Sequence, residues 1–400
     1  MDASADVVVV GGGTVGAWCA YFLRRGGAGR VVLIDKRPLG QGATSRAAGI
    51  VRGQGGTPTA VRLAQWTQAF YLRQHEEIGA DSGFTVQGYF IPCFSEPEIV
   101  AARERMAMQH ELGLEVRWLD PDEAAEMNPT MARGVHLGGT YAPGDGWLHP
   151  PRNVAAYTVA MHASGVEVRE GCEFLGLGTD DSGRVTGVET STGRISTEHV
   201  VLTGGPELAE VGALAGIRVP TGGARHQVAV TERHPDLAAA RLPMVFDLPS
   251  GLYWRPEDRG VMFGMSNPVE TPGPAREIDH DYLEKIRARL AVLVPATRDL
   301  GLRKIWAATI DYTPDHLPII GPGLSVDGEA IAGVTVSSAA GHGMMWGPGV
   351  SRATADVVLT GSSDVVDTSI LGLDRFDADG RSNLATDPIA LPFPDVVSAR

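Results

Sequence analysis

Continuous apolar runs and a stretch of helical periodicity alternate at the start of the chain. Residues 7–10 are four valines in succession, and residues 31–34 form a second short apolar run. Such runs are typical of strands that are buried on both faces. Between them, residues 17–25 have the apolar spacing of a helix. The order strand, helix, strand predicts a βαβ unit with parallel strands.

Further elements follow along the chain, and their pattern changes in its second half. Helical periodicity recurs at residues 60–78, 96–112, 151–163, 282–293 and 348–360, and strand-like runs recur at 166–169, 199–203, 318–322 and 330–336. Residues 185–190 and 194–196 alternate around a Ser-Thr-Gly turn, which predicts a hairpin. Short strands separated by proline and glycine, at 227–231, 252–255 and 261–265, indicate an antiparallel sheet and therefore a second domain.

Length and composition are those of a globular protein with more than one core. A chain of 400 residues is expected to form two domains. The apolar content of 43% and the charged content of 20% are ordinary for such a protein. Residues 373–400 are polar and contain prolines, so we expect a tail that is poorly ordered or lies on the surface.

The charge balance and the cysteines exclude several classes of partner. The net charge of −14 argues against nucleic acid, which needs clustered lysine and arginine, but an anionic small molecule needs only one or two local cations. Cys19, Cys93 and Cys172 are scattered, so we predict neither a disulfide nor a metal site. No apolar run approaches about 18 residues, and residues 1–6 are too short and acidic for a signal peptide. We therefore expect a cytoplasmic protein without membrane attachment; its oligomeric state stays open.

The glycine-rich turn after the first apolar run has the spacing of a dinucleotide-binding motif. Gly11 permits a tight turn, Gly13 lets the backbone approach a pyrophosphate, and Gly16 lets the next helix pack close to the strand. The phosphates would lie on free N–H groups at the N-terminus of that helix. Asp35 ends the second strand, where a carboxylate can bind ribose hydroxyls. Both strands, the helix and the acid favour a nucleotide site over an unrelated glycine-rich turn.

Further segments accompany this motif in a fixed order. They are residues 42–49, the segment Tyr253-Trp254-Arg255-Pro256, residues 312–322, and Gly341-His342-Gly343 before the last helix. Together with the glycine motif, they resemble the flavin-dependent amine and amino-acid oxidoreductases that include D-amino acid oxidase, glycine oxidase and sarcosine oxidase. The resemblance covers roughly residues 5–375 and implies FAD rather than NAD as the cofactor.

The resemblance also implies an α/β fold whose FAD-binding domain is discontinuous. A Rossmann-like domain with a parallel sheet is expected from residues 1–85, 146–222 and 318–372. A substrate domain with a mostly antiparallel mixed sheet and helices is expected from residues 86–145 and 223–317.

Residues from several of these segments are expected to hold FAD. They are Gly11, Gly13, Thr14, Val15, Gly16, Asp35, Lys36, Thr44, Ser45, Arg46, Ala48, Gly49, Gly204, Gly205, Gly341, His342, Gly343 and Met344. The N-terminus of the last helix could stabilise negative charge on the reduced flavin, with His342 assisting as a catalytic residue. The alternative is a histidine that only bonds a backbone carbonyl. Ala308 and Arg46 stand where relatives carry a flavin-linked cysteine or histidine, so noncovalent FAD is expected.

Two residues are expected to contact the substrate directly. Arg52 follows the flavin loop without a gap, and a guanidinium can bind a carboxylate through two parallel hydrogen bonds. Its position resembles that of the carboxylate-binding arginine of monomeric sarcosine oxidases; a surface arginine is the alternative. Tyr253 resembles the substrate-facing tyrosine of glycine oxidase and is the second catalytic candidate. Asp145 and His149 could form an acid/base pair, but a turn that enters the next helix is favoured, and no general base is assigned.

Departures from the family pattern define the expected substrate pocket. Ile310 stands where glycine oxidase has its carboxylate-binding arginine. Met344 and Met345 stand where sarcosine oxidases have a second cation, and thioethers make a pocket apolar and adaptable. Met262 aligns with the lysine linked to oxygen activation. With Met345 and Met262 in the pocket, a secondary amine with an apolar group is favoured, although simple packing would also explain these methionines.

Three functions remain open on the sequence. The first is an amine oxidase that acts on a glycine-like or N-substituted amino acid with a carboxylate, passes its electrons to O2, and releases glyoxylate or formaldehyde after imine hydrolysis. The second is a dehydrogenase of the same fold with another electron acceptor. The third is a noncatalytic FAD-binding subunit of a larger complex.

Overall fold

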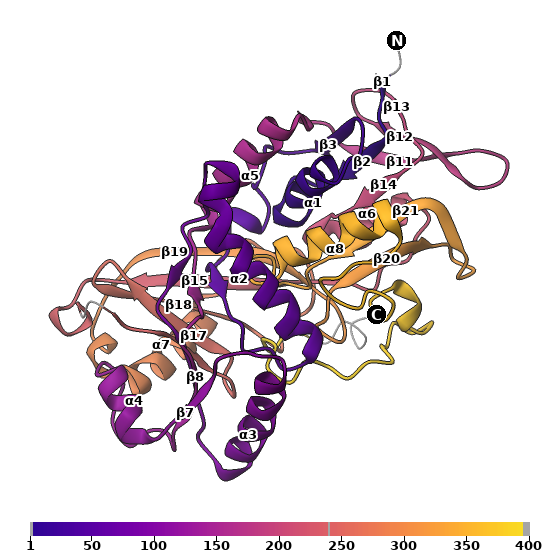
Figure 1. The fold of residues 1–400 in the computed structure, drawn as a ribbon. Helices are drawn as coiled ribbons and strands as arrows, with labels where there is room; N and C mark the ends of the chain where they lie inside the picture. The colour runs from indigo at the N-terminus through magenta and orange to yellow at the C-terminus, as the bar shows by residue number, and fades with distance from the viewer. Residues whose placement is uncertain (1–2, 239–240, 395–400) are drawn as a thin grey trace.

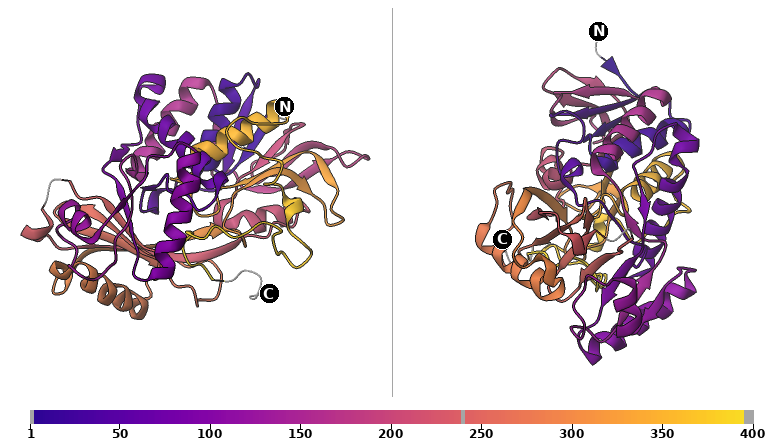
Figure 2. Two further views of the ribbon diagram at one scale, coloured as in Figure 1. Left: turned by 60° about the horizontal axis from the view of Figure 1, so that its bottom comes forward. Right: turned by 90° about the vertical axis from the view of Figure 1, so that its left-hand side faces the viewer.

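Two large sheets divide the molecule, one in the upper half and one in the lower half of Figure 1. The computed structural model describes residues 3–238 and 241–394. The upper sheet has six strands in the order β10-β3-β2-β14-β21-β20, and the lower sheet has eight in the order β19-β15-β18-β17-β16-β6-β8-β7. Figure 2 shows the long helix α2 and the yellow C-terminal segment passing close to both sheets.

The six-stranded sheet is parallel except at one edge. Its strands are β2 (Val7–Val10), β3 (Val31–Asp35), β10 (Glu167–Glu170), β14 (Val200–Leu202), β20 (Ile319–Leu324) and β21 (Ala330–Ser338). Only β20 pairs antiparallel with its neighbour. The valines of β2 are buried on both faces, as the continuous apolar run indicated. The expected α/β fold with a Rossmann-like sheet is thus confirmed.

Helices cover this sheet and fix the position of the glycine turn. They are α1 (Thr14–Arg25), α2 (Pro58–Ile78), α5 (Pro150–Ser164), α6 (Leu208–Leu214) and α8 (Gly347–Thr360). Trp18 of α1 is fully buried, and its ring lies edge-on to Phe70 at 5.0 Å and to Tyr157 at 6.1 Å. This aromatic cluster joins α1 to α2 and α5. Among the described residues, no helix is both long and apolar enough to cross a membrane.

Two small sheets complete the fold of the described residues. One has the order β1-β13-β12-β11 and contains β1 (Ala3–Ser4), β11 (Phe174–Thr179), β12 (Val185–Thr190) and β13 (Ile195–Ser196). The expected hairpin is confirmed, because β12 and β13 pair antiparallel. The other sheet contains β4 (Ile50–Val51), β5 (Thr85–Val86) and β9 (Gly146–Trp147). Strand β4 ends at Val51, so the pairing within this small sheet fixes the position of the backbone at the next residue, Arg52.

The eight-stranded sheet is mainly antiparallel, as the short strands predicted. Its strands are β6 (Tyr89–Pro92), β7 (Arg117–Leu119), β8 (Gly139–Ala142), β15 (Gly222–Thr231), β16 (Met244–Asp247), β17 (Leu252–Glu257), β18 (Gly260–Ser266) and β19 (Leu302–Tyr312). Only β16 and β6 pair parallel. The helices of this half are α3 (Glu96–Glu111), α4 (Pro121–Met127) and α7 (His280–Leu293). The expected domain boundaries stay a prediction, and their ends at residues 1–2 and 395–400 lie outside the described residues.

The expected tail lies partly on the surface in its described residues 373–394, but Arg375, Asp387 and Ile389 are buried and anchor it to the rest of the fold. The Arg375 guanidinium and the Asp315 carboxylate form an ion pair with both side chains at most 2% exposed, through contacts of 2.8 and 3.1 Å. The Ser382 hydroxyl also donates to the Asp315 carboxylate. The backbone N–H of Asp387 donates to the backbone carbonyl of Asp315. Composition could not reveal this attachment, because the partner lies far away in the sequence.

The Arg375→Ala variant tests how strongly this ion pair stabilises the fold. Removing one partner of a buried pair leaves an uncompensated charge, so we expect a loss of about 3–5 kcal/mol in the free energy of unfolding. Burial alone would raise the pKa of Asp315, but the hydrogen bonds and charge of Arg375 hold it below 3.8. Its contribution is therefore present above pH 3.8 and is lost as the pH falls through the folded-state pKa.

Urea unfolding of the wild type and of Arg375→Ala between pH 3 and pH 7 measures the difference in their free energies of unfolding. The exposed Arg381, which pairs with Asp379 in the same segment, provides the control. Arg381→Ala should change the free energy of unfolding by less than about 0.5 kcal/mol. Equal effects of the two substitutions would contradict the assigned role of the buried pair.

Candidate active site

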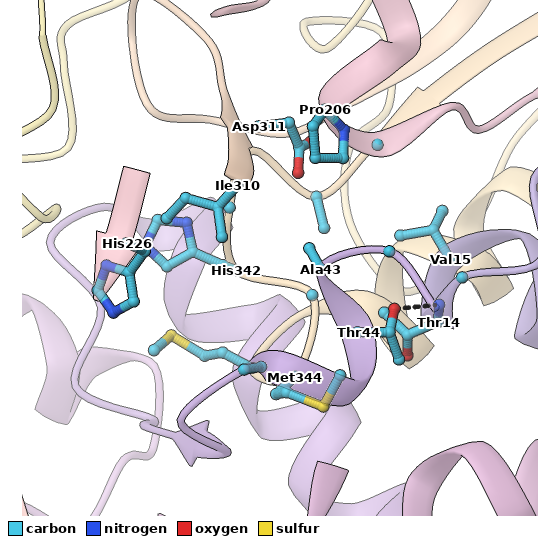
Figure 3. A pocket seen from close by; sticks show the side chains of 18 of the residues that line it. Thr14, Val15, Ala43, Thr44, Pro206, His226, Ile310, Asp311, His342 and Met344 are labelled. Atoms are coloured by element: carbon cyan, nitrogen blue, oxygen red, sulfur yellow. Dashed lines mark hydrogen bonds between the residues drawn. The ribbon is translucent and has the colours of Figure 1, made fainter. Parts of the chain in front are cut away.

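One cavity extends from the end of the six-stranded sheet to a face of the eight-stranded sheet. It contains about 1340 Å³ of empty space, its open mouth included. In Figure 3, Thr14 and Val15 lie on one side of the cavity, and His226 and His342 lie on another.

The glycine turn at one end of the cavity leaves no space for side chains. Gly11 has φ of 108°, and a Cβ there would lie 2.7 Å from the Thr203 carbonyl oxygen. A Cβ at Gly16 would lie 1.9 Å from the Gly11 carbonyl oxygen. Helix α1 begins after Gly13 without a side-chain cap, so its N-terminus offers N–H groups to a ligand in the cavity.

Asp35 and Thr44 hold the loops around this turn. The Asp35 carboxylate accepts hydrogen bonds from the backbone N–H groups of Gly12 and Arg37, each at 2.7 Å. Each carboxylate oxygen keeps a free lone pair for a ligand. The backbone N–H of Thr14 donates to the Thr44 hydroxyl at 3.0 Å, shown as a dashed line in Figure 3. This bond ties the loop at 42–49 to the start of α1.

His342 lies between the two ends of the cavity as a neutral imidazole. Its Nδ1 lies 2.8 Å from the Ala340 carbonyl oxygen, which can only accept, so Nδ1 carries the proton. Burial, with smaller contributions from Arg52 and His316, lowers the pKa of His342 to about 3. Its ring also packs on Trp346 at 4.1 Å. His342 therefore makes the hydrogen bond to a backbone carbonyl that was the alternative to a catalytic role. Its imidazole also lines the cavity.

Arg52 lies at the other end of the cavity and is only 3% exposed, which excludes the alternative of a surface arginine. Its Nη2 donates to the Ile389 carbonyl at 3.1 Å, and its guanidinium lies 5.8 Å from the Tyr89 ring centre and 5.4 Å from that of Phe246. Among the described residues, Nε and Nη1 of Arg52 have no hydrogen-bond partner. Two buried donors of a cation are thus left for a ligand.

The carboxylate of Asp145 fixes the backbone that follows Arg52. It accepts from the N–H groups of Gly53 at 2.7 Å and Gln54 at 3.4 Å, and from the Gln68 amide at 2.8 Å. Burial raises the pKa of Asp145 to about 6, against the lowering effect of these donors and of Arg52. Asp145 lies in a turn, as its Asp-Gly sequence indicated, but the sequence did not reveal its contact with the Arg52 segment.

A histidine and a tyrosine form a hydrogen-bonded pair opposite the glycine turn. His226 Nε2 lies 2.6 Å from the Tyr253 hydroxyl, and His226 Nδ1 lies 2.8 Å from the Ser266 hydroxyl. Burial lowers the pKa of His226 to about 4, so the neutral ring donates in one contact and accepts in the other. Burial also raises the pKa of Tyr253, which stays protonated. Both rings line the cavity.

Comparison with known proteins identifies the family. A family model described as FAD dependent oxidoreductase (DAO) matches residues 6–357. The chain belongs to this DAO family. It is 27% identical over 379 residues to 4-methylaminobutanoate oxidase (formaldehyde-forming) of Paenarthrobacter nicotinovorans. The aligned region covers 92% of this chain and 45% of that protein. It is 28% identical over 364 residues to glycine oxidase of Geobacillus kaustophilus, which covers 88% of this chain and 92% of that protein.

Solved structures of DAO-family relatives share the fold. L-proline dehydrogenase from P. horikoshii superposes with a TM-score of 0.86 at 24% identity, over 94% of this chain and 98% of that chain. The lengths of the relatives differ, however. The chain spans less than half the length of 4-methylaminobutanoate oxidase and of the mouse and human sarcosine dehydrogenases.

The cofactor of this family is FAD, and the cavity fits it. The glycine turn has the positive φ and the close backbone contacts that a diphosphate site needs. Asp35 has lone pairs available where a ribose would lie. Glycines at 204 and 205, and again at 341 and 343, keep the cavity wall free of bulky side chains. Noncovalent attachment stays a prediction; Cys19, Cys93 and Cys172 are all absent from the described lining.

Most of the residues expected from the sequence meet at this cavity. The lining includes Gly11, Gly13, Thr14, Val15, Asp35, Thr44, Ala48, Gly49, Arg52, Gly204, Gly205, Tyr253, Gly341, His342, Gly343, Met344 and Met345. Other candidates lie outside the described lining, namely Gly16, Lys36, Ser45, Arg46 and Met262. Lys36 instead lies 3.3 Å from the Glu207 carboxylate, and the Met262 sulfur accepts from Arg255 at 3.5 Å. The structure does not test the roles assigned to these residues.

Sequence reasoning missed several lining residues, among them His226, Tyr89 and Phe246. It also missed Ile389 and Leu391 of the C-terminal segment. One signal was available for these last two, because apolar residues at 389, 391 and 393 alternate as they do in a half-buried extended segment.

Gly16→Ala is expected to abolish FAD retention, because the new methyl group would collide with the Gly11 backbone and push α1 away from the turn. The absorbance of the purified protein near the flavin band measures the ratio of FAD to protein. Gly144→Ala is the control, since a Cβ at Gly144 meets nothing within 4 Å. Full FAD content in Gly16→Ala, with the control unchanged, would contradict the placement of the cofactor.

Acid precipitation of the wild type should release FAD into the supernatant if the attachment is noncovalent.

Proposed function

We propose that this chain is an FAD-dependent oxidase of a glycine-like or N-substituted amino acid. The carbon next to the nitrogen loses a hydride, and water converts the resulting imine into an amine and glyoxylate or formaldehyde. O2 is the proposed final acceptor and is reduced to H2O2. When bound, FAD would supply the two-electron acceptor for the oxidation of the C–N bond. The buried, partly unpaired guanidinium of Arg52 is the observation that carries the proposal.

Arg52 would bind the carboxylate of the substrate. An arginine side chain stays protonated in proteins, so the free Nε–H and Nη1–H groups are donors of a permanent cation. Leaving such donors unpaired in a buried site costs free energy, and a carboxylate removes that cost while it neutralises the charge. The rings of Tyr89 and Phe246 beside the guanidinium exclude water and strengthen the attraction.

Tyr253 and His226 would position the amine nitrogen. The Tyr253 hydroxyl lies on the cavity wall, and its contact with His226 fixes the direction of its remaining hydrogen-bonding group. Neither residue carries a charge at neutral pH, since burial raises the pKa of Tyr253 and lowers the pKa of His226. A neutral pair favours an uncharged amine over an ammonium group, and the uncharged amine is the form that can lose a hydride.

The remaining walls favour an apolar group on the substrate. Ile310 and Met345 line the cavity, and neither adds a second cation. The names of the relatives support the same class of substrate, because they describe oxidation of a methylamino acid and of glycine.

An anaerobic titration tests the proposed reaction directly. The FAD-loaded protein is mixed with glycine, N-methylglycine, proline and N-carboxymethyl amines of increasing chain length, and the flavin absorbance is followed. We expect bleaching that strengthens with chain length. Admission of air then restores the absorbance if O2 is the acceptor; persistent bleaching would instead indicate a dehydrogenase. No bleaching by any of these amines would overturn the proposed function.

Arg52→Ala should raise the apparent KM for a carboxylate substrate about 100-fold or more, as expected for the loss of a buried charge pair. Arg52→Lys keeps the charge but loses the fork of parallel donors, so we expect an intermediate KM. Arg73→Ala provides the control, because Arg73 lies on the outside of α2 and pairs with Glu77. Steady-state kinetics of the three variants measure the effect. Unchanged KM in Arg52→Ala would refute the assignment of this residue.

A further inference from the structure

The C-terminal segment at residues 386–394 returns to the cavity and forms part of its wall. Ile389 is fully buried, and both Ile389 and Leu391 line the cavity. Leu391 also packs against the hydrophobic cluster that contains Tyr89 and Tyr253. Side chains from this segment therefore lie beside the same residues that the proposed function assigns to substrate binding.

The backbone of this segment also contacts the substrate-binding cation. The Ile389 carbonyl accepts the Arg52 Nη2–H at 3.1 Å, across 337 positions of the sequence. This single bond limits rotation of the guanidinium while Nε and Nη1 keep no described partner. The segment thus orients Arg52, while Nε–H and Nη1–H stay available to a carboxylate.

Several contacts hold the segment in a fixed position. The Asp387 carboxylate accepts the Ile389 backbone N–H at 3.0 Å, which shapes the turn that presents the Ile389 carbonyl. The neighbouring loop has a glycine, Gly56, where it meets this segment, and a Cβ there would lie 2.0 Å from the Asp387 carboxylate. The segment can therefore pack directly against the backbone of that loop. Phe393 stacks on Tyr312 with ring centres 4.9 Å apart. Prolines at 388, 392 and 394 restrict the backbone further.

We propose that residues 386–394 are a specificity-determining wall of the substrate site. In this arrangement the Ile389 carbonyl positions Arg52, and the side chains of Ile389 and Leu391 limit the length of the apolar group on the substrate. The inference rests on the proposed function, because it assigns the wall to the carboxylate site of Arg52. It makes Ile389 a positioning residue as well as a steric limit.

The test measures binding rather than turnover. Straight-chain carboxylates from acetate to octanoate lack an amine, so they can bind but cannot be oxidised. Their dissociation constants with the FAD-loaded protein are obtained from calorimetry and from the change in the flavin spectrum. Ile389→Ala removes part of the wall and should shift the preferred chain length upwards, with a gain of about 10-fold for the longer acids relative to acetate.

Truncation tests the positioning role independently of the side chain. A chain that ends at residue 385 lacks the Ile389 carbonyl, so we expect at least 10-fold weaker binding of acetate together with a broader length profile. A chain that ends at residue 394 keeps the whole wall and is the matched control. Asn383→Ala, at an exposed position shortly before the segment, is the control for the point variant. Both controls should bind like the wild type.

The outcomes separate the wall from the site itself. A shifted length profile in Ile389→Ala supports the proposal, since a merely structural role would weaken all the acids alike. An unchanged profile in Ile389→Ala overturns it even if the truncated chain does not fold. Absence of carboxylate binding in the wild type would instead overturn the carboxylate role of Arg52 in the proposed function, and the wall assignment with it.

Discussion

The buried cation of Arg52 is the constraint around which the cavity is organised. An arginine cannot lose its proton, so a site that buries one must supply acceptors and opposite charge. The carboxyls of Asp145 and Asp387 are both buried, and the charge of Arg52 lowers the pKa of each against the raising effect of burial. The same charge helps to keep His342 neutral. Burial is the largest influence on all three pKa values, and the charge of Arg52 adds a smaller contribution to each.

Contacts across strands explain how the opposite wall can hold two aromatic side chains. Tyr253 in β17 lies opposite Gly264 in β18, and a Cβ at Gly264 would lie only 2.2 Å from the tyrosine hydroxyl oxygen. His226 in β15 pairs with Ser266 of the same strand β18. The small residues of β18 thus leave the space in which the tyrosine and histidine meet. The order of the strands, rather than any single loop, places these two groups at one point of the cavity.

The nucleotide end of the site could be predicted because its signals are local. Gly11 and Asp35 belong to one strand-helix-strand unit, and short-range spacing decides where both lie. The substrate end combines residues that no local pattern connects. His226 received no assignment because its partner Tyr253 lies on another strand, and Ile389 was missed because its segment reads as a polar tail. Resemblance singled out Arg52, which lines the cavity, but the carbonyl that accepts from its guanidinium and the carboxylate that fixes the following backbone come from distant turns.

The wall at residues 386–394 also bears on the order in which the protein takes shape during synthesis. The 337 positions between Arg52 and Ile389 must all be made before the two groups can meet. The last strand of the six-stranded sheet ends at Ser338, and α8, which covers that sheet, ends at Thr360. A nascent chain could thus assemble its nucleotide cradle while the pocket beside Arg52 is still open to water. Closing that long loop is entropically costly, so the substrate pocket would form after the nucleotide cradle.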